Sequence, residues 1–377
     1  MFIYLFIFLL SIFFARLCEL SDKKIYRIAF AALAVLLPAL LAGLRDYGIG
    51  HDTTIYVDYT FDEVSDYQDV SLWTFLKAVV GGEFTQEPFY CFLNYVGLQF
   101  GPEVNYVYFV VSLVTITLVF NAIYLYREKA SMPMMMFVFL FLYFNVSLNI
   151  IRQTVAMALA INVFLYLERK QWIAAIVFLI IMLFSHTTSL VFFLFLLLYV
   201  AVVRRAAKKV VTFLILIIPV SLILLDYIIL LAISLNVVPK KFMIYMMEEE
   251  ETAVMKTAVL FGWLVLGAMF LYGRFLLKKD ETSRETVFIF NVKLFSNLLT
   301  LASTVSLWAF RMAYYFSVFD ILFIPRFIRL VSEEDENKGK LLNTFFVVLI
   351  IFYWYWSIIH NNENETYPYK SVLLGIQ

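Results

Sequence analysis

The chain has no excess of basic charge and very little cysteine. Its 29 lysine and arginine residues are balanced by 29 aspartate and glutamate residues, which gives a formal net charge of zero. A nucleic-acid-binding protein needs a basic excess or a basic stripe, so the sequence argues against a nucleic-acid partner. The two cysteines, Cys18 and Cys91, fall on opposite membrane sides in the topology that the charges predict, and we expect no disulfide.

Charged residues of either sign are scarce, since they make up only 15% of the 377 positions. The mean hydropathy of +0.87 is far above that of a soluble globular chain, so the sequence predicts a polytopic membrane protein. A helical span takes about 20 mostly apolar residues, and about twelve such runs can be read along the chain. The runs lie at residues 2–16, 27–44, 105–126, 133–148, 150–167, 171–184, 187–203, 210–235, 253–273, 287–309, 312–331 and 341–359.

These apolar runs are continuous, whereas a membrane barrel would need alternating strands of about ten residues. Lipid offers the backbone no hydrogen-bond partners, so the runs should be helices. We therefore expect an all-α fold that forms one integral membrane domain over residues 1–377. The first run has no basic residue before it and no small-residue cleavage signature after it, and it reads as an uncleaved span.

Lysine and arginine separate between alternate loops, and the richer set marks the cytoplasmic side. This rule places both termini outside. The basic loops contain Arg16, Lys23, Lys24, Arg27, Arg127, Lys129, Arg169, Lys170, Arg204, Arg205, Lys208, Lys209, Arg274, Lys278, Lys279, Arg284, Arg326, Arg329, Lys338 and Lys340. The largest outward segment, about residues 45–103, is acidic and includes two apolar stretches, 72–76 and 89–96. We expect these to be amphipathic helices at the membrane interface that cap a cavity between spans.

Three arginines stand beside spans on the outer face, against the positive-inside tendency. Arg45 follows the second run, Arg152 begins the fifth, and Arg311 lies between the tenth and eleventh. A single arginine at a bilayer edge can simply orient its helix. Three of them, each with a guanidinium fork suited to phosphate, indicate a site for a diphosphate or another anion.

Two side chains on the same face have the chemistry of a general base. Ser185-His186-Thr187-Thr188 interrupts an apolar stretch without the glycine or proline of an ordinary turn, and histidine can take a proton near neutral pH. Asp52, in the stretch from Leu44 to Asp52, is either a base for a sugar hydroxyl or a helix cap. His51, Asp52 and Asp58 lack a diagnostic metal-ligand spacing, so we predict no metal and no cofactor.

Six short motifs, taken in order, resemble the EpsG family of bacterial exopolysaccharide membrane proteins, which belongs with the Wzy-type polysaccharide polymerases. They are Leu44-Arg45 through Gly50-His51-Asp52 and Tyr56, then Glu87-Pro88, Ile151-Arg152-Gln153, Ser185-His186-Thr187, Arg311 with Tyr314 and Tyr315, and Pro368-Tyr369. His51 departs from the pattern, which has a small or hydroxyl residue before the aspartate.

This resemblance implies a polymerase at the outer face of the bacterial cytoplasmic membrane. Its substrate would be an oligosaccharide linked to undecaprenyl diphosphate, and a flippase and a chain-length regulator are expected partners. The implied site has Asp52 or His186 as the base. The residues implied to bind the diphosphate are Arg45, Arg152, Gln153 and Arg311, and Arg45 could instead be a structural partner of Asp52. The residues implied to contact the acceptor or form a lid are Tyr56, Glu87, Tyr315 and Tyr369.

Three other functions remain open from the sequence. A transporter or flippase for lipid-linked sugar is favoured by Asp226, Lys293 and Asp320 inside apolar runs, although the chain lacks the repeat symmetry typical of transporters. A related lipid-linked glycosyltransferase or ligase would share the same chemistry and differ only in its acceptor. A noncatalytic scaffold in an export complex is the third.

Overall fold

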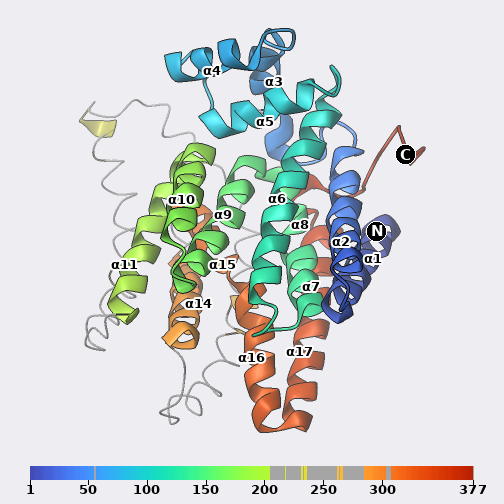
Figure 1. Cartoon of the computed structure of the whole chain (residues 1–377), viewed down its shortest axis with the longest axis vertical. Helices are drawn as coiled ribbons and strands as arrows, with labels where there is room; N and C mark the ends of the chain where they lie inside the picture. Colours follow the sequence, from blue (N-terminus) through green and yellow to red (C-terminus); the bar gives the residue numbers. More distant parts are fainter. Residues whose placement is uncertain are drawn as a thin grey trace. The chain divides into compact units, whose positions relative to one another are not determined.

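The computed structural model describes residues 1–54, 57–203, 284–302 and 307–376, together with residues 217, 231, 233–235, 261–262 and 264–265. The predicted spans at 210–235 and 253–273 fall almost wholly outside these residues. The chain divides into two compact units, Met1–Ser189 with Ile324–Gln377, and Leu190–Phe323. The described part of the chain is helical, apart from one isolated bridge between Ser371 and Ile376 (Figure 1).

Five described helical segments have the length and composition to cross a membrane. They are α1 (Phe2–Leu20), α2 (Lys24–Gly43), α6 (Val104–Tyr126), α9 (Ile151–Glu168) and α17 (Glu336–Trp354), which a π-helical turn extends to His360. Shorter apolar helices include α7 (Met132–Leu142), α10 (Trp172–Ser185) and α11 (Phe192–Val203). An all-α membrane protein is thus what the chain forms, while the total of twelve spans stays a prediction.

Two predicted spans are each built from two helices. The run at 133–148 breaks at Tyr143 into α7 and α8 (Phe144–Asn149), and the run at 312–331 corresponds to α15 (Leu307–Ser317) and α16 (Asp320–Glu334). Arg311 therefore lies inside α15, and its predicted position between two spans is wrong. Arginine is a good helix former, so α15 continues through it and ends six residues later, at Ser317.

Helix α9 is the most enclosed of the five long helices. In its most apolar window, 78% of the residues are buried, against 28% for α1. The small side chains of Ala156, Ala158 and Ala160 are buried and let α6 and α10 pack closely against α9. Helix α9 is therefore enclosed by its neighbours, and Arg152 sits in its first turn.

The acidic segment at about residues 45–103 folds into a 3₁₀ turn and three helices, at the upper end of the view (Figure 1). They are η1 (His51–Thr54), α3 (Val57–Ser65), α4 (Leu72–Gly81) and α5 (Pro88–Leu98). Phe75 stacks on Tyr95 with ring centroids 4.3 Å apart, within a small core that also contains Cys91. Helix α5 packs against α6, where a side chain at Gly97 would come within 2.8 Å of the Val107 backbone. Both predicted amphipathic segments are helices.

A polar network fixes the C-terminal segment on the helical core. The Tyr4 hydroxyl donates to the Thr366 carbonyl at 2.6 Å, and the Asn145 amide donates to the Thr366 hydroxyl at 2.9 Å. Trp354 Nε1 donates in turn to Asn145 Oδ1 at 2.9 Å. These bonds pair buried polar groups that would otherwise be costly, and they bring residues after α17 beside the start of α1.

The second unit has its own apolar core around Phe195 of α11, whose ring stacks on Phe319 at 4.7 Å and meets Phe288 of α14 (Arg284–Ala302) at 4.9 Å. One buried ion pair crosses this core. Lys293 Nζ lies 2.6 Å from Asp320 Oδ2, with each side chain less than 5% exposed. Two charges that the sequence placed inside separate apolar runs are therefore neutralised by each other.

Candidate functional site

Three helix ends meet in the first unit and bring polar side chains together. Glu87 is the extended N-cap residue of α5, which Pro88 begins because proline suits the first helical position. Arg152 is the second residue of α9, directly after the kink at Ile150. His186 ends α10 in an extended conformation, with φ −164° and ψ 131°. The predicted polar break at His186 is confirmed.

Glu87 lies at the centre of this group. Its Oε2 atom is 2.6 Å from Arg152 Nη1, and its Oε1 atom is 2.9 Å from His186 Nδ1. Oε1 also accepts bonds from the backbone nitrogen of Thr187 at 2.9 Å and from the Thr187 hydroxyl at 3.2 Å. Gln86 adds a second acceptor for Arg152 Nη1. One carboxylate therefore holds a guanidinium and an imidazole that are distant in sequence.

The electrostatics of the group favour a charged Glu87. Burial raises the pKa of its carboxyl group, but the hydrogen bond from His186, the charge of Arg152 and the bond from the Thr187 backbone outweigh burial and hold the pKa well below its ordinary value. The side chains of Glu87, Arg152 and His186 are only 12–16% exposed. Coulombic interactions between them are therefore screened less than at an open surface.

The bond to Glu87 also orients the imidazole ring. Because a carboxylate can only accept, the Nδ1 atom of His186 carries the proton in this bond, and in the neutral ring Nε2 is then the nitrogen that can accept one. A carboxylate that fixes the tautomer of a histidine in this way is how general-base histidines are commonly prepared. The arrangement is chemically suited to removing a proton from a hydroxyl group.

Arg152 is held from two directions. Besides its bonds to Gln86 and Glu87, its guanidinium carbon lies 5.8 Å from the centre of the Tyr90 ring. The neighbouring Gln153 is buried, with 3% exposed. A guanidinium in so fixed a position is a pre-organised donor for an anion.

Arg45 has different surroundings. It is 1% exposed, its Nη1 and Nη2 atoms donate to the carbonyls of Ala42 (2.8 Å) and Leu148 (3.3 Å), and it lies 4.0 Å above the Tyr108 ring. These contacts join the end of α2 to the end of α8. No ion pair between Arg45 and Asp52 occurs among the described residues, so the geometry favours a structural role for Arg45.

Asp52 lies in the turn η1, near the kink between α8 and α9. Its backbone nitrogen donates to Asn149 Oδ1 at 2.9 Å, three positions before Arg152. The turn approaches α8 so closely that a side chain at Gly50, where φ is +96°, would lie 2.5 Å from the Leu148 carbonyl. His51 points to Glu365, with Nδ1 3.3 Å from Oε1. Tyr56 lies outside the described residues.

The remaining predicted residues are held elsewhere. Tyr369 is buried, donates from its hydroxyl to the Leu41 carbonyl at 2.8 Å and meets the Tyr4 ring edge-on at 5.5 Å. Arg311 and Tyr315 belong to the second unit, where Tyr315 is fully buried. The structure thus brings together Glu87, Arg152 and His186 from the sequence-predicted set.

From the sequence, Glu87 was predicted only as an acceptor or lid contact, and Gln86 and the Thr187 backbone were not predicted to belong to the site. The available signal was local: a glutamate stands before a proline that begins a helix, in an acidic segment that contains only two basic residues. That signal identifies a helix start, and it does not identify which side chains the glutamate meets.

The chain was compared with protein families, curated proteins and solved structures. No curated protein and no solved structure is similar enough to match it. The sequence profile of the EpsG family matches residues 28–371, which is nearly the whole chain and includes every motif described above. The chain belongs to the EpsG family, a family of Wzy-type polymerases.

Proposed function

We propose that this protein is a polysaccharide polymerase that transfers a glycan chain from undecaprenyl diphosphate to a hydroxyl group of an incoming lipid-linked repeat unit. The observation that carries the proposal is the pair of bonds from Glu87, which holds Arg152 and His186 together in one sheltered group. This reaction needs a fixed base to take the proton of the acceptor and a fixed cation to stabilise the leaving diphosphate. Membership of the EpsG family supports the same class of activity.

The transfer can be written with every atom balanced. The acceptor hydroxyl oxygen attacks the anomeric carbon of the donor glycan and forms the new glycosidic bond. The bond from that carbon to the diphosphate oxygen breaks, and undecaprenyl diphosphate leaves with the electron pair. The proton of the hydroxyl passes to Nε2 of His186, while Glu87 stabilises the imidazolium that forms through Nδ1.

Arg152 offsets the negative charge that develops on the leaving diphosphate, in a site where water is largely excluded. Gln153 is proposed as a further donor to the diphosphate, and Tyr56 as a contact of the acceptor sugar. Arg311 and Tyr315 belong to the second unit, and their predicted roles stay predictions. Asp52 is the alternative base. Glu87 contributes through His186 and Arg152 and is a positioning residue.

We propose that the reaction takes place at the outer face of the bacterial cytoplasmic membrane. The support is the distribution of charge, because the ends of α1 and α6 that lie away from Glu87 carry Arg16 and Arg127, and lysine and arginine mark the cytoplasmic side. A flippase that delivers the repeat unit and a regulator of chain length are the proposed partners.

The test is reconstitution of the purified full chain into liposomes with undecaprenyl-diphosphate-linked repeat units and no other enzyme. A polymerase extends the units into a ladder of lipid-linked chains, which gel electrophoresis resolves. A flippase moves the units across the bilayer without extending them, and a ligase acts only when a different acceptor is added. A scaffold does none of these.

Variants of the same preparation test the residues. Arg152→Ala and His186→Ala should leave only single repeat units while the protein is present at the wild-type level. Asp52→Asn distinguishes the two candidate bases. If Asp52→Asn leaves only single repeat units and His186→Ala polymerises normally, then Asp52 is the base. Asp69→Asn, an exposed carboxylate outside the group, is the matched control and should polymerise normally.

A further inference from the structure

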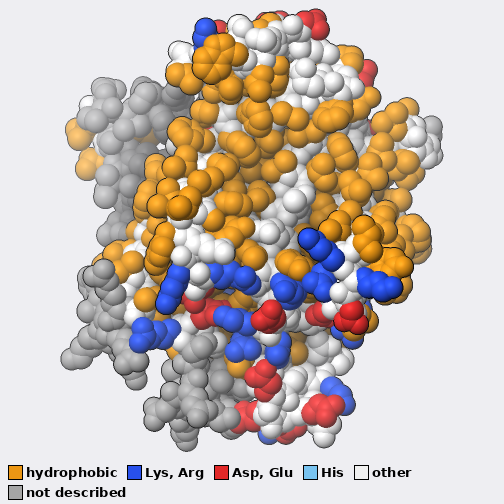
Figure 2. Space-filling view, in the orientation of Figure 1, with side chains coloured by type: hydrophobic (Ala, Val, Ile, Leu, Met, Phe, Trp, Pro, Cys, Tyr) orange, Lys and Arg blue, Asp and Glu red, His pale blue; other side chains and the backbone are white. Residues whose placement is uncertain are grey.

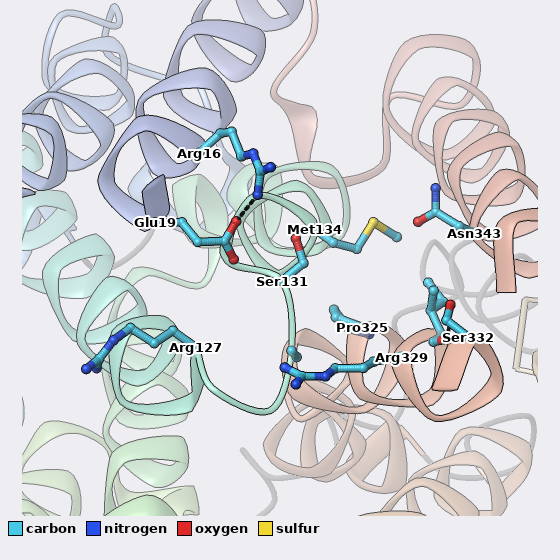
Figure 3. A pocket seen from close by; sticks show the side chains of 11 residues that line it. Arg16, Glu19, Arg127, Ser131, Met134, Pro325, Arg329, Ser332 and Asn343 are labelled. Carbon is cyan, nitrogen blue, oxygen red and sulfur yellow. Dashed lines mark hydrogen bonds and ion pairs between the residues drawn. The ribbon is translucent and has the colours of Figure 1, made fainter. Parts of the chain in front are cut away.

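A second polar site lies in the first unit, at the other end of its long helices. A cavity of about 360 Å³ opens between α1, the α6–α7 connection, α16 and α17 (Figure 3). Arg16, Glu19, Arg127 and Arg329 provide its charges, and Ser131 and Asn343 are among its neutral polar groups. None of these residues takes part in the Glu87 group.

The cavity and the Glu87 group are separated by the length of a membrane span. Helix α6 begins beside α5 and ends at Tyr126, next to Arg127 of the cavity. At about 1.5 Å per residue, its 23 residues cover about 34 Å. Figure 2 shows lysine and arginine side chains gathered in a band below a broad hydrophobic surface. By the positive-inside rule this end faces the cytoplasm.

The charge of the cavity is suited to an anion. Three of the charged residues that line it are arginines and one, Glu19, is a carboxylate; outside the lining, Arg127 also lies 3.5 Å from Glu128 and Arg329 lies 3.0 Å from Glu333. The side chains of Arg16, Arg127 and Arg329 are 52%, 30% and 44% exposed. Nη1 of Arg16 lies 2.5 Å from the Glu19 carboxylate, and the guanidinium has five N–H donors in all. The arginines therefore keep donors for a further group.

The start of α7 lies beside the cavity, and its backbone donor is already used by Glu19. Oε1 of Glu19 accepts a bond from the backbone nitrogen of Met132, the first residue of α7, at 2.9 Å. A carboxylate already occupies this helix start, where the helix dipole favours negative charge. An anion in the cavity would meet the arginines beside it.

An apolar surface leads from the lipid region to this cavity. Phe6, Leu9 and Phe13 of α1 are 60%, 63% and 54% exposed, and their spacing puts them on one face of the helix. Arg16 follows Phe13 by three residues, so it continues that face at the end where the cavity opens. A molecule with a hydrocarbon chain along Phe6, Leu9 and Phe13 would carry its headgroup to Arg16.

We propose that this cavity binds the phosphate group of an anionic membrane lipid. A free phosphate compound shares the charge but has nothing to place on the apolar face of α1, and for that reason the lipid is favoured. This site does not depend on the reaction proposed for the Glu87 group.

Native mass spectrometry of the purified full chain in detergent, titrated with phosphatidylglycerol or phosphatidylcholine, tests the site. Phosphatidylglycerol should bind at least about tenfold more tightly than phosphatidylcholine, and Arg16→Gln with Arg329→Gln should weaken its binding by at least about tenfold. The matched control is Lys338→Gln with Lys340→Gln, which removes the same charge from exposed side chains of α17 outside the cavity lining. The control should bind like the wild type.

Two further arms complete the test. Asn343→Trp fills the cavity from an exposed position without altering charge and should also weaken binding, which covers the case in which the arginine variant does not accumulate. Glycerol phosphate, which lacks the hydrocarbon chains, should displace the lipid only at far higher concentration. The proposal is overturned by equal affinity for the two lipids, by wild-type affinity in the cavity variants, or by displacement at equal concentrations.

Discussion

Oε1 of Glu87 lies 2.9 Å from Nδ1 of His186, although 99 residues separate the two along the chain. The other oxygen of the same carboxylate lies 2.6 Å from Arg152. Glu87 thus joins the starts of α5 and α9 to the end of α10, and the position of each polar side chain depends on the other two. A substitution at Glu87 should therefore lower both the stability and the activity of the protein.

Glu87→Gln keeps the size of the side chain and removes its charge. We expect a loss of about 2 kcal/mol in the free energy of unfolding, because bonds to two charged or polarised donors become neutral ones. Elongation should also slow, since the ring of His186 loses its orienting carboxylate. Thermal unfolding and elongation in liposomes measure the two effects, with Asp69→Asn as the control for loss of one acidic charge.

The contribution of Glu87 should depend on pH in a defined direction. Its pKa in the folded protein is lowered from the ordinary value of 4.5, so the stabilisation is complete above that value and is lost as the pH falls through the lowered pKa. The difference in melting temperature between wild type and Glu87→Gln should be constant at neutral pH and shrink in acid. A difference that grows on acidification would contradict the account.

Gly50→Ala and Gly48→Ala form a matched pair in the loop before η1. Both glycines have positive φ, +96° and +85°, which an alanine adopts at a cost of about 1 kcal/mol. A side chain at Gly48 meets nothing within 4 Å, whereas one at Gly50 would meet the Leu148 carbonyl at 2.5 Å. Gly50→Ala should therefore lower the melting temperature clearly more than Gly48→Ala does. Equal shifts would mean that the loop does not pack on α8 as described.

Lys293→Ala should destabilise the second unit strongly, by about 3 kcal/mol or more, because it leaves the buried carboxylate of Asp320 without its cation. Replacing both residues, Lys293→Met with Asp320→Leu, should restore much of the stability. The yield and the melting temperature of purified protein distinguish the two cases. A double variant that folds but fails to elongate repeat units would show that the pair has a role beyond packing.

The sequence predicted the helical class and most helix positions because continuous apolar runs have few alternatives in lipid. It also located the break at His186, where four polar residues interrupt an apolar stretch. It could not identify Glu87 as the residue that joins Arg152 and His186, because those contacts span 65 and 99 residues and depend on how three helices pack. Arg45 shows the same limit, since its burial against Tyr108 follows from tertiary packing. Arg311 was misplaced because hydropathy locates a charge without showing whether the helix continues through it.

The most direct test of the central claim is the initial rate of repeat-unit addition by His186→Ala protein in liposomes that contain only lipid-linked repeat units. Loss of a general base lowers a rate by about 10²–10⁴-fold, and we predict a decrease in that range at wild-type protein level. His360→Ala is the matched histidine control, because His360 bonds to Asn361 and stacks on Trp356 outside the Glu87 group, and it should elongate normally. A His186→Ala protein that adds repeat units at the wild-type rate would contradict the assignment of the site.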